Sequence, residues 1–141
     1  MIRFRAWDKV AKVIIYNIEQ TYDGLGYFKE NEDIEDYVSN ISFECFSDWL
    51  ENEQFVIMQS TGLLDKNGRE IFEGDILYFE PYETHGNDRV VEYIDGAYRG
   101  RLIRNGHSKL LAECVYETKI IGNIYENPDL LESVEEWRSI H

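Results

Sequence analysis

Three carboxylates lie close together in the middle of the chain, at Glu70, Glu73 and Asp75. Paired carboxylates act as general acid and base when they converge in a cleft that perturbs their pKa values. The same residues also fit a turn, because an Asp side chain beside a glycine readily accepts hydrogen bonds from nearby backbone N–H groups. Because the chain has 28 acidic residues, three carboxylates can lie close together in the sequence by chance, so we favour the turn. We therefore assign no catalytic residue, and a small enzyme using these carboxylates is the alternative function.

Residues of metal-binding types are present, but their spacing matches no known site. The run from Asp65 to Gly68 begins like a calcium loop. An EF-hand needs glycine at loop position six and glutamate at position twelve. Here glycine falls at position four and Ile76 at position twelve. No metal-site or nucleophile spacing connects the remaining candidates, which are His85, His107, His141, Cys45 and Cys114. We expect no metal, no cofactor and two reduced thiols.

Negative charge is concentrated in one segment. The chain has 14 basic and 28 acidic residues, a net charge of −14. Ten of the acids, and no basic residue, fall between residues 30 and 65. Such a charge repels nucleic acid and anionic membranes, so we expect neither as a direct partner. It suits a protein partner, especially a basic one, and we predict that five clustered acids form the contact: Glu30, Glu32, Asp33, Glu35 and Asp36.

Basic and aromatic side chains gather on the predicted strands that follow. The basic cluster is Arg99, Arg101 and Arg104. These side chains suit phosphate contacts, but pairing with the acidic segment, within the chain or across a homo-oligomer interface, fits the net charge better. Small barrels also use aromatic side chains to bind peptides. For the four tyrosines here we favour a simpler role, in which some pack in the core and the others cover the surface: Tyr78, Tyr82, Tyr93 and Tyr98.

Tight turns organise the stretch from residue 59 to 77. Glycine enters the left-handed backbone region without steric cost, and Asn and Asp stabilise turns through their side chains. A further glycine inside the last predicted strand indicates a β-bulge or close backbone packing. The predicted structural turn residues are Gly62, Gly68, Gly74, Asp75 and Gly122.

Three segments of the chain resemble the YopX-like family. The opening segment is Arg3-Phe4-Arg5-Ala6-Trp7-Asp8, the central motif includes Ile71-Phe72-Glu73-Gly74-Asp75-Ile76, and the closing segment begins Ile120-Ile121-Gly122-Asn123. They occur in the family's order and span most of the chain. The resemblance implies an origin in phages or prophages of Gram-positive bacteria and a small β-barrel of SH3-like type, and it assigns no biochemical activity.

Strand-like patterns outnumber helical ones and predict a mainly β fold. Alternation predicts a strand at 2–8, with 12–18 as its hairpin partner. Short apolar runs predict buried strands at 55–58 and 76–79, and further strands are expected at 89–94, 97–104 and 118–125. Short helices are expected after an N-cap at Ser47 and at 109–114, and Asn127-Pro128-Asp129 is typical of a helix start. The predicted organisation is an N-terminal hairpin with an acidic insertion (1–59), a partly open SH3-like barrel (60–127) and a short C-terminal helix packed on it (128–141).

The sequence also predicts where the protein acts. No apolar run approaches the roughly 20 residues that span a bilayer, and no stretch of signal-peptide length follows the N-terminal arginines. We expect a cytoplasmic protein, which for a phage product means the host cytoplasm. The predicted function is that of a non-enzymatic, protein-binding accessory protein.

Overall fold

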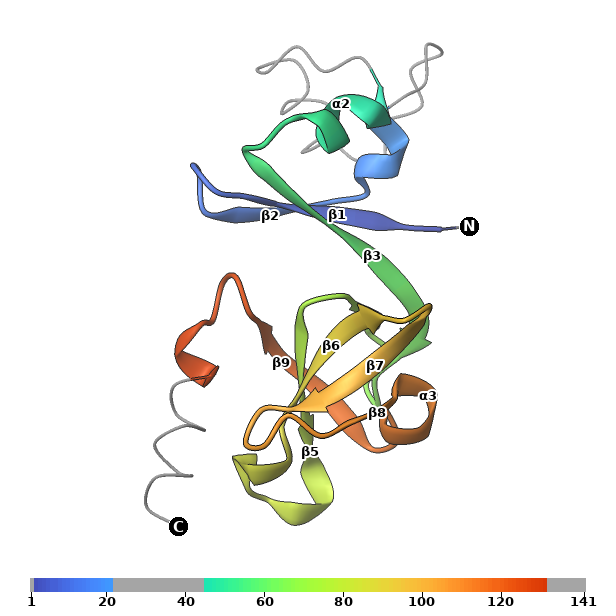
Figure 1. Ribbon diagram of the computed structural model, residues 1–141, viewed down its shortest axis with the longest axis vertical. Coiled ribbons are helices and arrows are strands. Elements are labelled where there is room, and N and C mark those ends of the chain that lie inside the picture. The colour runs from blue at the N-terminus through green and yellow to red at the C-terminus, as the bar shows by residue number, and fades with distance from the viewer. Residues whose placement is uncertain (1, 22–44, 132–141) are drawn as a thin grey trace. The chain divides into compact units, whose positions relative to one another are not determined.

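The structure of the chain, a computed structural model, describes residues 2–21 and 45–131 (Figure 1). The chain divides into two compact units, Met1–Ser60 and Thr61–His141. The boundary predicted after residue 59 lies next to this division. Strands account for 45% and helices for 21% of the described residues, which confirms the mainly β class. No helix among these residues is long and apolar enough to cross a membrane.

The first unit is built on an antiparallel hairpin that a buried aspartate stabilises. The hairpin consists of β1 (Phe4–Asp8) and β2 (Val13–Tyr16), and β1 also pairs with β3 (Phe55–Leu64). The turn between β1 and β2 lacks glycine. Instead, Asp8 Oδ1 accepts hydrogen bonds from Val10 N–H at 2.9 Å and Ala11 N–H at 3.0 Å. The same oxygen accepts one from Gln54 Nε2 at 2.9 Å, so one carboxylate connects the turn to the start of β3.

A fully buried tryptophan forms the centre of this unit's core. Trp49 belongs to α2 (Phe46–Glu51) and packs edge-on against Phe55. Its Nε1 donates a hydrogen bond of 2.6 Å to Thr21 Oγ1, at the end of η1 (Ile18–Thr21). The prediction of Ser47 as N-cap was wrong, because the helix begins two residues earlier and Cys45 is the capping residue. Asp48 Oδ2 accepts the Cys45 N–H at 3.2 Å, so the acid in the first turn fixes the start.

The second unit contains a five-stranded antiparallel sheet that curls into a half barrel (Figure 1). Its order is β8-β7-β6-β5-β9. The bounds are β5 Asp75–Phe79, β6 Arg89–Ile94, β7 Ala97–Leu102, β8 Ser108–Leu110 and β9 Thr118–Asn123. The second unit also contains β4 (Glu70–Phe72). It pairs with β3 and is the last strand of a four-stranded sheet with the order β2-β1-β3-β4. The SH3-like designation stays a prediction, whereas the half barrel is what the structure contains.

Turn chemistry sets the connections of this sheet. Asp95 and Gly96 have φ values of 52° and 84°, which is the geometry of a two-residue hairpin turn between β6 and β7. The longer β5–β6 connection contains η3 (Glu80–Tyr82) and η4 (His85–Asn87). The helix predicted at 109–114 is shorter than expected: residues 108–110 pair with β7 as β8, and α3 covers only Leu111–Cys114.

Both faces of the curled sheet are covered. Neighbouring residues on a strand point to opposite faces, so Ile76 and Leu77 enter different clusters. Leu77 packs with Ile71, Val91 and Leu111, the first residue of α3. Ile76 packs with Val90 and Ile103, and Leu130 and Leu131 cover that cluster. The predicted short C-terminal helix is confirmed, and it begins at Asp129.

Candidate functional site

The three clustered carboxylates differ in burial and lie outside the pocket described below. Asp75 is 1% exposed, and its Oδ2 accepts the Phe72 N–H at 2.8 Å, across the turn that Gly74 makes at a φ of 87°. Burial raises the pKa of the Tyr98 phenol, and the nearby Glu73 charge raises it further. Glu70 and Glu73 are both half-buried, and none of the three carboxylates lines the pocket described below. Asp75 therefore has the turn role that the sequence favoured over catalysis.

Asp65 occupies the position that resembled the start of a calcium loop, and its carboxylate is fully used by the backbone. Oδ1 accepts N–H hydrogen bonds from Asn67 at 2.9 Å and Arg69 at 2.8 Å, and Oδ2 accepts one from Ile120 at 3.0 Å. Burial by itself would raise the pKa of Asp65, but these backbone donors together hold the pKa below its usual value. The side chain thus joins the turn to β9.

The predicted turn glycines all have positive φ, and Gly122 also marks a bulge. Gly62 and Gly68 have φ values of 79° and 81°. The register between β5 and β9 shifts beside Gly122, because Ile76 pairs with Gly122 and Leu77 with Ile120. A Cβ on Gly122 would lie 2.7 Å from Cγ of Asn127, whose side chain accepts the Asn123 N–H. Close packing by the Asn127 side chain is the reason for glycine here.

The charged and aromatic candidates are distributed between sheet and pocket. The five predicted partner-binding acids, Glu30, Glu32, Asp33, Glu35 and Asp36, lie outside the described residues. Arg101 pairs with Glu92 at 2.8 Å across β6 and β7, and Arg99 donates to Ser108 Oγ at 2.7 Å. These two arginines therefore serve the sheet itself. Tyr93 and Tyr98 pack edge to face, whereas Tyr82 lines a pocket.

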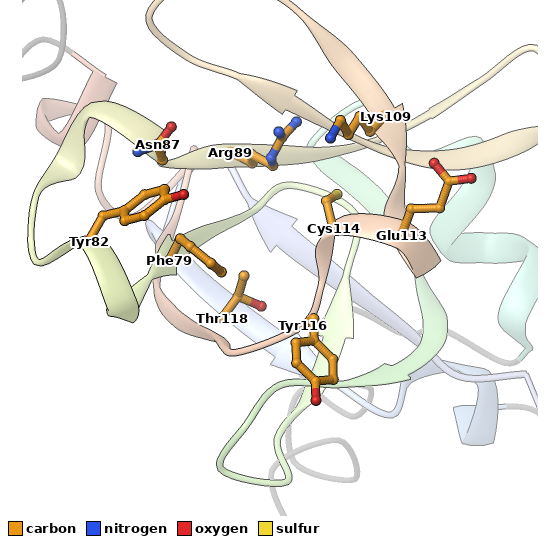
Figure 2. Close-up of a pocket in the computed structure, with 9 residues that line it drawn as sticks. All are labelled: Phe79, Tyr82, Asn87, Arg89, Lys109, Glu113, Cys114, Tyr116 and Thr118. Atoms are coloured by element: carbon orange, nitrogen blue, oxygen red, sulfur yellow. The ribbon is translucent and has the colours of Figure 1, made fainter.

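That pocket lies within the second unit and has a volume of about 380 Å³ (Figure 2). The end of β5, η3, η4 and the first residue of β6 contribute to it. So do β8, α3 and the first residue of β9. Its volume falls in the range of natural small-ligand sites. The pocket was not anticipated from the sequence, because its residues come from seven elements and from the residues that follow α3.

One side of the pocket is cationic, although the chain as a whole is acidic. Figure 2 shows Asn87, Arg89 and Lys109 along this side. Arg89 donates from Nη1 to the Gly100 carbonyl at 2.7 Å, and Lys109 is the β8 residue paired with Gly100. Two strands that flank β7 therefore bring two cations together. Glu113 is the one acid among the described lining residues.

The opposite side is aromatic and partly open to solvent. Phe79 and Tyr82 pack edge to face with ring centroids 4.9 Å apart. Tyr82 is 62% exposed and Tyr116 is 75% exposed. Figure 2 shows these two tyrosines at separate ends of a row that also contains Phe79 and Thr118. Rings this exposed contribute little to the core and remain available to stack on a bound molecule.

Cys114 lines the pocket near Arg89, and Gly100 makes room for both. A Cβ on Gly100 would lie 2.8 Å from Cys114 Sγ and 3.0 Å from Arg89 Cδ. Burial raises the pKa of the Cys114 thiol, although the nearby Arg89 charge opposes the shift. The thiol is therefore protonated near neutral pH and a poor nucleophile. The signal that sequence reasoning missed is the glycine inside a strand, which commonly marks a close approach.

A buried carboxyl lies in the loop that carries two pocket residues. Asp88, between Asn87 and Arg89, is 1% exposed. Its Oδ2 lies 2.8 Å from His85 Nδ1, and its Oδ1 has no hydrogen-bond partner among the described residues. Burial raises the pKa of Asp88 to about 6, against the opposing effect of His85. No group of three or more His, Cys, Asp or Glu side chains within residues 2–21 and 45–131 is arranged to hold a metal ion.

Comparisons with known proteins identify the family. The chain is similar to a crystal structure of protein EF1440 from Enterococcus faecalis, with 28% sequence identity and a TM-score of 0.56 over 93% of this chain and 98% of that one. A crystal structure of yopX from Bacillus subtilis matches with 15% identity and a TM-score of 0.49, over 91% and 96% of the two chains. No curated protein matches. The model of the YopX protein family matches residues 3–132, so the chain belongs to that family.

Proposed function

We propose that the protein is a non-enzymatic binding module. The observation that carries this proposal is the composition of the pocket, which combines two cations with aromatic side chains but offers no pair of carboxylates. Its thiol has a raised pKa, and no histidine is among the described lining residues to activate it. Groups that hold a ligand are therefore present without a set that would break a bond in it.

The partner that we propose is a protein, and a basic one. Between residues 30 and 65 the sequence has ten acids and no base, which amounts to ten of the fourteen net negative charges. Uniform negative charge of this kind attracts a basic surface and accelerates its association. Together with the family match, it supports an accessory protein of phage or prophage origin that acts in the host cytoplasm.

The test is an affinity capture from bacterial lysate with two versions of the protein. One is intact, and in the other Glu30, Glu32, Asp33, Glu35 and Asp36 are replaced by Gln or Asn. A protein retained by the first and lost by the second supports the proposal, provided that retention also weakens at raised salt, because screening acts on exposed charges. Capture of the chain's own second copy would indicate a homo-oligomer. Equal retention by both versions, or retention by neither, contradicts the proposed contact.

A further inference from the structure

We infer that the pocket between Arg89 and Tyr116 binds a small anion that carries a planar ring, of the nucleoside monophosphate class. This inference goes beyond the proposed function, because it concerns a small ligand and not a protein partner. It rests on two observations in the second unit, the two cations and the row of aromatic rings opposite them, and on the acidic charge of the chain.

The cations form the part of the pocket that would hold phosphate. Arg89 is fixed by its bond to the Gly100 carbonyl, which uses one of the five N–H donors of a guanidinium. Lys109 adds three donors from β8, on the other side of β7. Planar guanidinium and point-charge ammonium groups are the side chains that proteins use for phosphate. Glu113 lies beside Lys109 in Figure 2, on the side away from Arg89, so the phosphate would lie between Lys109 and Arg89, within reach of both cations.

The aromatic row would hold the ring. Tyr82 and Tyr116 are more than half exposed and come from different segments, η3 and the residues that follow α3. Phe79 packs against Tyr82 and lies between the two tyrosines in the row that Figure 2 shows. Nucleic acid bases stack on such rings with little dependence on base identity. A molecule with phosphate at one end and a base at the other would therefore contact both sides.

The charge of the chain selects against larger anions. A net charge of −14 repels a polyanion, and the repulsion acts over about 8–10 Å at physiological salt. A single phosphate beside Arg89 and Lys109 meets two nearby cations. Each further phosphate of an oligonucleotide, or each acid of an acidic peptide, would lie outside the pocket, and the second unit, Thr61–His141, has 16 acidic against 9 basic residues in its sequence. A mononucleotide is thus favoured over a polymer with the same groups.

The test is calorimetric titration of the full chain with adenosine 5′-monophosphate and uridine 5′-monophosphate. Three further probes resolve the parts: adenosine, inorganic phosphate and a single-stranded thymidine hexamer. Saturable binding of a mononucleotide, tighter than binding of adenosine, phosphate or the hexamer, is the expected result. Absence of mononucleotide binding overturns the inference. Equal binding of inorganic phosphate overturns the role of the rings, and tighter binding of the hexamer overturns the selection for small size.

Two exposed pocket residues and one control locate the binding. Lys109→Gln and Tyr116→Ala are each expected to weaken mononucleotide binding by roughly tenfold, through a lost charge-assisted hydrogen bond and lost stacking respectively. Lys119→Gln removes a cation next to Thr118 that does not line the pocket, and it should change affinity by less than about twofold. Thermal melts verify that each variant is folded. Equal affinities of all three variants would place the ligand elsewhere and overturn the inference.

A second readout does not depend on substitution in the pocket. Cys45 lies in the first unit and Cys114 in the pocket, so a Cys45→Ser variant leaves one thiol to follow. Serine is a good N-cap, so this change suits the start of α2. Bound mononucleotide should slow alkylation of Cys114. Unchanged alkylation at saturating mononucleotide contradicts occupancy of this pocket, and it does so independently of whether a protein partner is captured.

Discussion

Two buried aspartates in the second unit show how differently the molecule treats the same side chain. Asp65 is 5% exposed and Asp88 is 1% exposed. The pKa of Asp65 lies below its usual value and that of Asp88 rises to about 6. Three backbone N–H groups donate to Asp65. The carboxyl of Asp88 has a single described hydrogen-bond partner, the partly exposed His85 side chain. Its other oxygen has no hydrogen bond among the described residues.

The difference teaches that burial alone does not set the charge state of a carboxyl. Desolvation raises both pKa values, and the number of donors aimed at the oxygens decides the outcome. Asp65 is therefore a well hydrogen-bonded structural residue that connects its turn to β9. The loop from His85 to Arg89 holds a poorly satisfied acid next to the pocket, and such departures from full hydrogen bonding concentrate where a protein keeps function rather than stability.

The largest expected effect on the free energy of unfolding comes from removing the Asp65 carboxylate. Asp65→Ala leaves the N–H groups of Asn67, Arg69 and Ile120 without their acceptor, two of them in the turn and one on β9. We expect a loss of roughly 3–5 kcal/mol in the free energy of unfolding, measured by urea denaturation. Glu113→Ala removes an exposed acid and should change stability by less than about 0.5 kcal/mol. Equal effects of the two substitutions would mean that the hydrogen bonds of Asp65 do not stabilise the fold.

The next effect is a pH dependence that distinguishes the two aspartates. The folded pKa of Asp88 is raised, so its favourable contribution is full below the unfolded value near 3.8 and is lost as pH rises through about 6. Asp88→Asn should remove a decline of about 2–3 kcal/mol across this window. Asp65 has the opposite sign, since its contribution is present above the unfolded pKa and is lost as pH falls.

Urea denaturation between pH 4 and 7 measures this decline, and Asp95→Asn provides the matched control. Asp95 lies in an exposed hairpin turn at a φ of 52°, which Asn tolerates. This control should keep the pH dependence of the unchanged protein. A decline that survives in Asp88→Asn would show that another group titrates, and the contrast between the two aspartates would then be lost.

The third effect concerns the backbone at the other end of the same turn region. Gly74 has a φ of 87°, donates its N–H to the Val91 carbonyl at 2.8 Å and accepts the Ile124 N–H at 2.9 Å. Gly74→Val should lower the free energy of unfolding by roughly 1–3 kcal/mol, because a β-branched residue is strained at this φ. Gly74→Asn should be milder, since Asn tolerates the left-handed region. An unchanged melting temperature in the valine variant would remove the claim.

The sequence indicates a turn in this region because most of the determinants are local. Asp75 and two of the three hydrogen bonds to Asp65 act on backbone within a few residues, and the residue types indicate that role. The pocket could not be predicted in the same way. Arg89, Lys109 and Tyr116 are ordinary surface residues in sequence. The register of β6, β7 and β8 brings the two cations together, and Tyr116 reaches the same pocket from the residues between α3 and β9. Chain topology, and not residue type, carries that information.

One local prediction was wrong and another held only in part, for a related reason. The sequence placed an N-cap at Ser47, but a contact between the Asp48 side chain and the Cys45 N–H starts α2 earlier. It also placed one helix over 109–114, where pairing with β7 extends residues 108–110. In both cases a hydrogen bond outside the considered motif overrode the local preference. Gly100 was overlooked because its reason lies on other elements, in Arg89 and Cys114.

The smallest expected effect tests whether the pocket region is more adaptable than the turn. Gly100→Ala places a Cβ 2.8 Å from Cys114 Sγ and 3.0 Å from Arg89 Cδ, which are side-chain atoms that can move aside. We therefore expect a loss of only about 1 kcal/mol, at the low end for overpacking and below that of Gly74→Val. Adding Cys114→Ala should recover part of it, because the double variant removes the nearer clash. Thermal denaturation of the two single variants and the double variant gives this coupling. If Gly100→Ala were as damaging as Gly74→Val and Cys114→Ala brought no recovery, the pocket wall would be as rigid as the turn, and the contrast between the two regions would be confined to their carboxyl groups.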